Sequence, residues 1–149
     1  MADGLSETRP RWLVAAVFGL VVMITWTVVV KYIVPLAWFA AERAAGRAPE
    51  AAPVMWDLWP LVHLGLAVLL WRRHRSAWLA GLVVATVEVV IVAVKLAAYL
   101  RAPERDLWSL LWASNKLFVL LYFLWLLALL LRRGRQAVGE ARVRELVRA

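Results

Sequence analysis

The chain has 149 residues, of which 64% are hydrophobic, with a formal net charge of +8 and no cysteine. A soluble domain carries only about 45–50% apolar residues, so this composition excludes an ordinary soluble domain. The absence of cysteine also excludes disulfides, thiol redox chemistry and iron–sulfur clusters. We therefore expect a single all-α domain, a polytopic integral membrane four-helix bundle of the cytoplasmic (inner) membrane.

The first predicted span covers residues 12–34, and apolar character resumes after Lys31 as far as Ala41. A secretory signal has an apolar core of only about 7–15 residues, so we interpret this stretch as an uncleaved span. The whole stretch is longer than an upright helix needs to cross about 30 Å of hydrocarbon. We expect either tilt or a break at Pro35, which lacks a backbone N–H.

Three further spans are predicted over residues 54–71, 77–100 and 107–131, followed by a basic tail over 132–149. Asp57 and Asp106 open two of them in a shared pattern, Asp-Leu-Trp-x-Leu. An aspartate at this position is a common helix cap, and the tryptophan suits the membrane interface. Duplication of a helical hairpin and convergence on one local pattern both explain the repeat.

The basic residues predict the orientation of the spans. Arg72, Arg73 and Arg75 occupy the second loop without an acid, and the tail carries six arginines against two glutamates. By the positive-inside rule, this loop and both termini are expected in the cytoplasm. The net charge is then explained by topology, and no nucleic-acid partner is predicted.

All three lysines lie inside apolar stretches, whereas all fifteen arginines lie in the polar segments. Glu88 follows Trp78 by ten residues, or about 15 Å of helix, and so falls near the bilayer midplane, as does His63. An ionised carboxylate there costs about 2.5–3.5 kcal/mol on insertion scales unless it is paired. We therefore interpret Glu88 and His63 as the candidate proton-handling residues.

The other polar residues lie in the predicted outer half. On the third span, Glu88, Lys95 and Tyr99 share one helical face with the small residues Gly81 and Ala85. We expect such faces to surround an outward-opening cavity, whose predicted ligand-binding residues are Lys31, Asp57, Lys95, Tyr99, Trp112, Asn115 and Lys116. The deep Trp26 and Trp125 are expected to serve bundle packing or to form a ligand wall.

Three functions fit this pattern. The first is binding or transport of an anionic amphiphile, coupled to protonation, because the lysines outnumber the carboxylates in the cavity. The second is an embedded acid/base enzyme acting on an isoprenoid-like or sterol-like lipid. The third is a non-catalytic subunit or assembly factor of a larger membrane complex. Its predicted partner is another membrane subunit or a second copy of the chain in a homo-oligomer. No metal and no cofactor are predicted.

Overall fold

The computed structural model of the chain describes residues 9–47, 49, 51–52, 54, 58–101 and 106–134, and every regular element among them is helical. Apolar side chains recur throughout these segments without interior glycine-proline clusters, which favours long helices. The elements are α1 (Arg11–Val28), the π-helical turn η1 (Val29–Ile33), α2 (Val34–Ala44), α3 (Trp59–Trp71), α4 (Ala77–Arg101), α5 (Leu107–Leu129) and the π-helical turn η2 (Leu130–Gly134).

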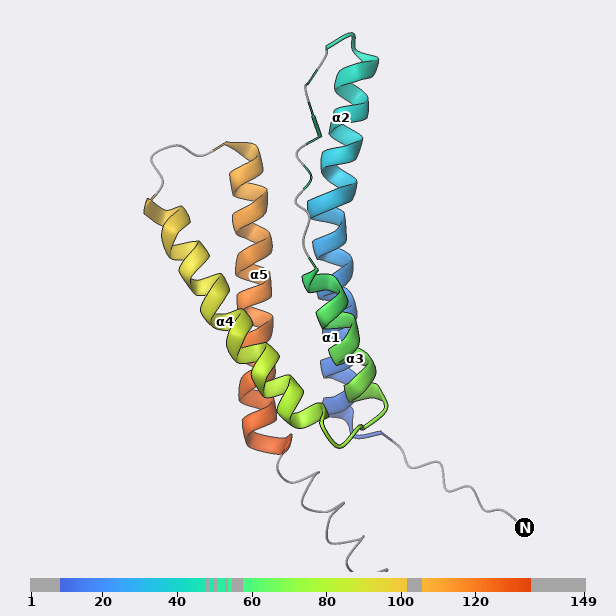
Figure 1. Cartoon of the computed structure of the whole chain (residues 1–149), viewed down its shortest axis with the longest axis vertical. Coiled ribbons are helices and arrows are strands. Elements are labelled where there is room, and N and C mark those ends of the chain that lie inside the picture. Colours follow the sequence, from blue (N-terminus) through green and yellow to red (C-terminus); the bar gives the residue numbers. More distant parts are fainter. Residues whose placement is uncertain are drawn as a thin grey trace, which may run out of the picture.

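The helices form a bundle in up-down order (Figure 1). Since α1, η1 and α2 run end to end as one long helix, the bundle has four members. The long helix packs against α3 and α5, and α4 packs against α3 and α5. The predicted all-α four-helix bundle is confirmed.

Three of these helices are long and apolar enough to cross a membrane: Arg11–Ala44, Ala77–Arg101 and Leu107–Arg132. The fourth, α3, begins at Trp59 rather than at residue 54 and has 13 residues. At 1.5 Å per residue it is about 20 Å long, which is less than the hydrocarbon thickness of about 30 Å. The second helix is thus shorter than the predicted span, and its upper end lies well below the tops of α2 and α5 (Figure 1).

The predicted break at Pro35 is not observed, because the helix passes through this residue as far as Ala44. The turn before it widens instead, and the Val34 N–H donates to the Val29 carbonyl oxygen, five residues earlier. Proline cannot donate to the carbonyl four residues before it, here that of Lys31. The π-helical turn is therefore the local adjustment by which an apolar helix keeps its direction across this proline.

The contact between α4 and α5 has a fixed antiparallel register. Near one end the rings of Tyr99 and Trp112 lie 6.0 Å apart, centroid to centroid. Gly81 lies eighteen residues before Tyr99 on α4, and Leu130 lies eighteen residues after Trp112, at the start of η2. A Cβ on Gly81 would lie 2.7 Å from Leu130 Cδ1. The face of α4 that carries the small residue Gly81 thus packs against the last helix of the same chain. The same register puts Lys95 level with Lys116.

A second close approach joins α1 to α5. A Cβ on Gly19 would lie 2.5 Å from Tyr122 Cε2, so only glycine fits beneath this ring. The Tyr122 hydroxyl donates a 2.7 Å hydrogen bond to the Ala16 carbonyl oxygen. Around these contacts, Leu20, Met23 and other apolar side chains form one continuous core.

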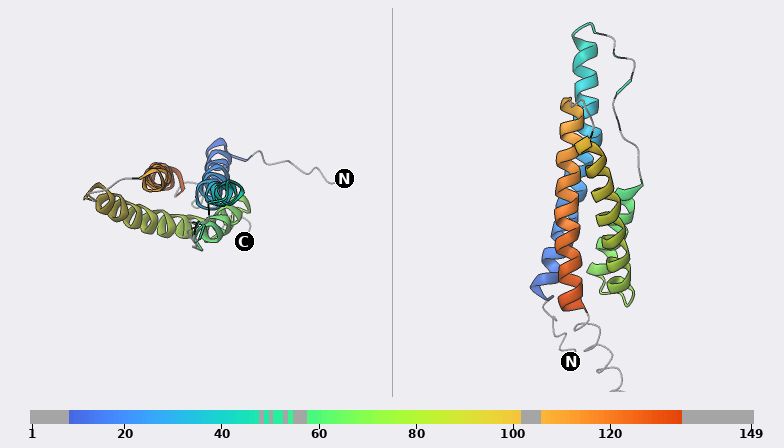
Figure 2. Two further views of the ribbon diagram at one scale, coloured as in Figure 1. Left: turned by 90° about the horizontal axis from the view of Figure 1, so that it is seen from above. Right: turned by 90° about the vertical axis from the view of Figure 1, so that its left-hand side faces the viewer.

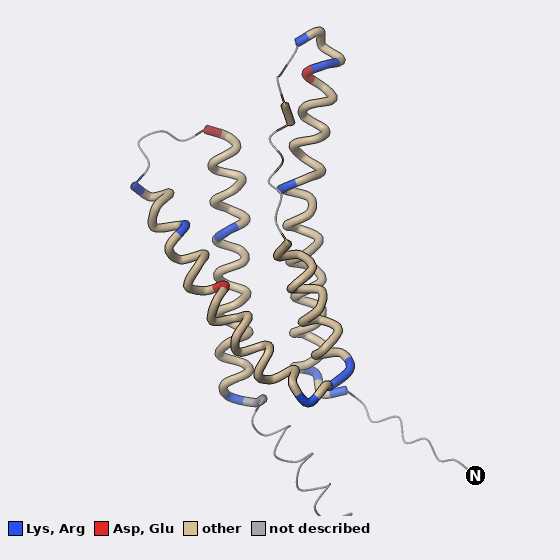
Figure 3. Tube along the Cα trace, viewed as in Figure 1, with Lys and Arg blue, Asp and Glu red and all other residues tan. Residues whose placement is uncertain are grey.

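Charge is distributed unevenly along the bundle. One end, here called the arginine-rich end, carries arginines from the start of α1, from the α3–α4 turn and from the end of α5 (Figure 3). The described N-terminal residues and η2 lie at this same end, as Figure 2 also shows. Between the ends, the outer surface is apolar and exposes Phe18, Val83, Val94 and Leu121, among other large side chains.

The start of α5 is fixed by a reciprocal cap. The Ser109 N–H donates to Asp106 Oδ1 over 2.7 Å, and the Asp106 N–H donates to Ser109 Oγ over 2.9 Å. Hydrogen bonds from Ser109 to the carboxylate, first through its backbone N–H and then through its side chain, lower the pKa of Asp106 below its ordinary value. The predicted cap at Asp106 is confirmed.

Candidate functional site

Two ionisable side chains on neighbouring helices meet in the core. His63 lies one turn after the start of α3, and Glu88 lies in the middle of α4. His63 Nε2 and Glu88 Oε1 are 2.8 Å apart, and each residue is only 3% exposed. The two residues that the sequence singles out for proton chemistry are therefore hydrogen-bonded to each other.

Aromatic rings hold the imidazole of His63 in place. Trp59 stacks on it with the ring centroids 5.8 Å apart, and Phe123 of α5 packs against it at 5.0 Å. The other ring nitrogen, His63 Nδ1, is buried and has no hydrogen-bond partner among residues the structure describes. One nitrogen is thus occupied by Glu88, and the other remains available to a small molecule or a water.

A second polar pair joins the long helix to α5. The Thr27 hydroxyl donates to Asn115 Oδ1 over 3.3 Å, and Asn115 is 1% exposed. Because its oxygen faces Thr27, the amide nitrogen Nδ2 points elsewhere, where no described group accepts from it. A buried amide N–H without an acceptor is unfavourable, so this position favours a bound acceptor oxygen.

Two of the three predicted lysines are buried in the same core. Lys31 lies on η1 and is 4% exposed, and Lys116 on α5 is 7% exposed. The turn η1 packs against α5, which brings the two lysine-bearing segments together. Lys116 Nζ lies 6.0 Å from the Trp112 ring centroid, within range of a cation–π interaction. Lys31 therefore does not extend to the surface.

The third lysine, Lys95, is exposed and is not part of the buried set. It lines an open groove of about 430 Å³ between α4 and α5, together with Tyr99 and Trp112. The structure therefore divides the single predicted cavity into two parts. One is a buried polar set of Thr27, Lys31, His63, Glu88, Asn115 and Lys116, and the other is this groove.

Three other predictions have different outcomes. Trp26 and Trp125 are 40% and 43% exposed, so they lie on the outer surface of the bundle and form no buried wall. Asp57 lies outside the described residues, and the position before α3 is taken by Leu58, which makes no side-chain cap. Ser109, whose N–H donates to Asp106, stands three residues after that aspartate, and Pro60 stands three residues after Asp57. Proline has no backbone N–H, so it cannot donate to a capping carboxylate in the same way.

Two contributors to the site could not be identified from the sequence. Thr27 shares a helical face with Lys31, which is a weak signal, whereas Phe123 is one apolar residue among many and carries none. Only the packing of α3 against α5 shows that its ring covers His63. Within the described ranges, no group of three or more His, Asp or Glu side chains could hold a metal ion.

Comparisons with protein-family models, with curated proteins and with solved structures find no match to this chain.

Proposed function

We propose that the bundle is embedded in the cytoplasmic membrane with its arginine-rich end in the cytoplasm. Three helices have the length and apolarity that a crossing requires, and the surface between the two charged ends is apolar. Arginines flanking such helices favour the cytoplasmic side. Both chain termini then face the cytoplasm, because the start of α1 and the end of α5 lie at the same end of the bundle (Figures 1 and 3).

Within this bundle, we propose a site that binds or transports an anionic amphiphile. The observation that carries the proposal is the buried hydrogen bond between His63 and Glu88, in the same core as Lys31 and Lys116. Helices that need only to pack together have no use for four ionisable side chains, each of which is unfavourable within a bilayer. Such residues inside a membrane bundle typically mark a pathway or a binding site.

The sign of the ligand charge follows from the buried residues. Two lysines and one glutamate are buried among the described residues, so positive charge is in excess when His63 is neutral. An acidic headgroup compensates this excess, and a cationic one does not. Its oxygens also suit the amide nitrogen of Asn115, which has no protein acceptor among these residues.

Protonation offers a means of coupling. The hydrogen bond between His63 Nε2 and Glu88 Oε1 lets one proton reside on either group, and the net charge of the pair changes when it gains or loses a proton. We therefore propose that binding of the acidic headgroup is coupled to protonation of this pair.

A second candidate function is acid/base catalysis on a lipid, and one observation favours it. Glu88 holds His63 through Nε2 and leaves Nδ1 without a partner in the described part of the chain. This is the arrangement of a general base that a carboxylate orients. The substrate would then be an isoprenoid-like or sterol-like lipid rather than a ligand released unchanged.

Native mass spectrometry of the gently solubilised protein tests both functions. The wild type is compared with Glu88→Gln, and Glu42→Gln serves as a control because Glu42 pairs with Arg47 at the surface. We expect a small anionic amphiphile on the wild type and the control, and its loss from Glu88→Gln. Chemical alteration of an added lipid would indicate the enzyme, and a stoichiometric protein partner without any lipid would contradict both functions.

A further inference from the structure

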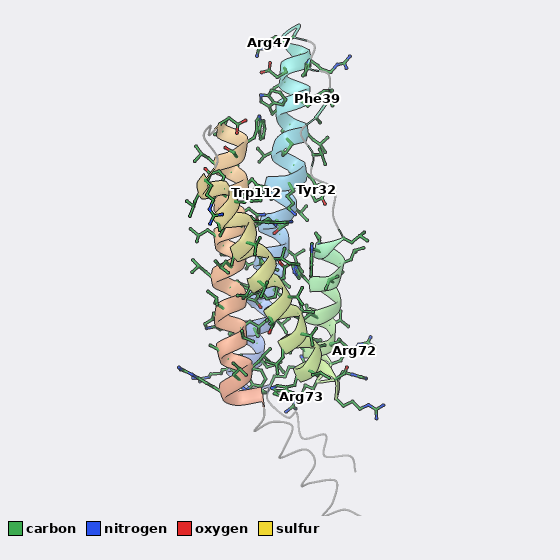
Figure 4. All side chains as sticks on the ribbon, turned by 60° about the vertical axis from the view of Figure 1, so that its left-hand side comes forward. Tyr32, Phe39, Arg47, Arg72, Arg73 and Trp112 are labelled. Carbon is green, nitrogen blue, oxygen red and sulfur yellow. The ribbon has the colours of Figure 1, made fainter. Side chains whose placement is uncertain are left out.

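The groove between α4 and α5 lies at the end of the bundle opposite the arginine-rich end. Its six lining residues come from the last turns of α4 and the first turns of α5: Lys95, Ala98, Tyr99, Trp108, Ser109 and Trp112. In the view of Figure 1 the last turns of α4 lie apart from the first turns of α5, and Figure 4 shows Trp112 in this upper part of the bundle. The groove is therefore open at the side of the bundle, where membrane lipid would surround it.

Aromatic contacts fix the groove walls. Tyr99 packs against Trp112 across the groove, and Trp38 of α2 packs edge-on against Trp108 with the ring centroids 5.2 Å apart. Tyrosine and tryptophan carry an apolar body and a polar tip, and both suit the headgroup level of a membrane. The exposed lining of the groove is thus almost wholly apolar, and the Lys95 side chain forms part of its wall.

Trp112 connects the groove to the buried polar set. Its ring lines the groove and also lies 6.0 Å from Lys116 Nζ on the buried side. Lys95, which is exposed in the groove, is level with Lys116 in the register of α4 and α5. It also lies seven residues, or about 10 Å of helix, from Glu88 on the same face of α4. A step between the two ammonium groups would carry an anion from the groove into the core.

We propose that this groove is the lateral entrance through which an anionic phospholipid of the outer leaflet reaches the buried site. The phosphate pairs first with Lys95 and then, after Trp112 moves aside, with Lys116. The acyl chain stays outside on the apolar surface that flanks the groove, where Val94, Leu100 and Leu110 are exposed. This inference rests on the proposed function and names its ligand class, a long-chain membrane phospholipid rather than a soluble anion.

The test uses the full chain in vesicles of phosphatidylcholine containing a minority of phosphatidylglycerol with a photoactivatable group in its acyl chain. Peptide mapping after illumination reports where the lipid lies. Ala98→Trp fills the groove, and Ala97→Trp is the matched control, because Ala97 is equally exposed but does not line the groove. Lys95→Met removes the charge at the entrance.

In the wild type we expect labelling of the peptide that contains Trp108 and Trp112. Labelling should fall at least tenfold in Ala98→Trp, because the groove is filled. It should fall about tenfold in Lys95→Met, which is the usual effect of losing a charge-assisted contact. Ala97→Trp should match the wild type. Equal labelling by photoactivatable phosphatidylcholine, or wild-type labelling of Ala98→Trp, would overturn the entrance.

Glu88→Gln separates the two proposals, since Glu88 does not line the groove. Groove labelling should persist in this variant while native mass spectrometry shows loss of the retained amphiphile. If the groove variants behave as the wild type and Glu88→Gln still loses the amphiphile, the buried site stands and the route is overturned. If the groove is labelled selectively by phosphatidylglycerol but Glu88→Gln still retains the amphiphile, the proposed function fails and the groove is a separate lipid site.

Discussion

Glu88 Oε1 lies 2.8 Å from His63 Nε2, and this hydrogen bond links α4 to α3 inside the core. Neither partner reaches solvent, since each is 3% exposed. A buried pair of this kind is asymmetric in its energetics: removal of one partner leaves the other without compensation, whereas apolar replacement of both can be nearly neutral. The pair is therefore dispensable for folding but not for the proposed chemistry.

This asymmetry predicts the outcome of two variants. His63→Leu leaves the Glu88 carboxylate buried without its partner and should lower the free energy of unfolding by about 3–5 kcal/mol. The double variant His63→Leu with Glu88→Met should recover most of that loss and still fail to bind the amphiphile. Reversible unfolding in mixed micelles measures the stability, and native mass spectrometry measures binding. A double variant as unstable as His63→Leu would show that the pair itself holds the bundle together.

A second prediction concerns the contact between Gly81 and Leu130. A Cβ at Gly81 would lie 2.7 Å from Leu130 Cδ1, and a larger side chain would force α4 and α5 apart. Gly81→Leu should lower stability by about 1–3 kcal/mol through overpacking, and Leu130→Ala in the same chain should restore part of it.

Gly65 on α3 provides the matched control for Gly81. A Cβ there meets nothing within 4 Å, so Gly65→Ala should be neutral or should stabilise the protein by up to about 1 kcal/mol. Thermal unfolding of both variants in the same detergent compares them directly. If Gly65→Ala were as harmful as Gly81→Leu, helix packing would not explain the effect at Gly81.

The sequence predicts much of the bundle because the signals are local. Long apolar stretches separated by Arg, Pro and Asp predict α4 and α5 almost to the residue, and Asp106 predicts where α5 begins. The predicted second span begins at residue 54, whereas α3 begins at Trp59, and Leu58 directly before it is apolar but not helical. Composition alone cannot distinguish an apolar loop segment from the first turn of an apolar helix.

The site is predictable in content but not in arrangement. An ionisable residue within an apolar helix is informative by itself, and this identifies His63, Glu88, Lys31 and Lys116. Which of these meet depends on the register between helices, which periodicity does not specify. The exposure of Lys95 shows the difference: it shares a face of α4 with Glu88, but Glu88 is buried and Lys95 is exposed.

A third prediction concerns acid conditions at the start of α5. Two hydrogen bonds from Ser109, through its N–H and its hydroxyl, lower the pKa of Asp106 below its ordinary value of 3.8. A lowered pKa means that the cap stabilises the helix fully above the ordinary value and loses its effect as the pH falls through the lowered one. Amide exchange at Ser109 should therefore accelerate only below about pH 4. In Asp106→Asn, which keeps the cap without the charge, the cap's contribution should not vary with pH, and a persisting acid step would contradict this origin.

The fourth prediction tests the charge of the buried site at Asn115. Asn115→Asp adds a carboxylate beside the Lys116-bearing turn of α5 and reduces the excess of positive charge, so affinity for phosphatidylglycerol should fall at least tenfold, about the effect of one charged contact.

Thr27→Val keeps the shape of its side chain but removes the hydroxyl that donates to Asn115 Oδ1, and it should cost about 1 kcal/mol of stability with a smaller effect on affinity. Titration of both variants with phosphatidylglycerol in micelles, followed by native mass spectrometry, compares them. A loss of affinity in Asn115→Asp alone assigns the effect to replacement of the amide donor by a carboxylate rather than to the orientation of the amide. Equal losses in both variants would assign the effect to the orientation of the amide, and unchanged affinity in Asn115→Asp would show that the anion binds elsewhere.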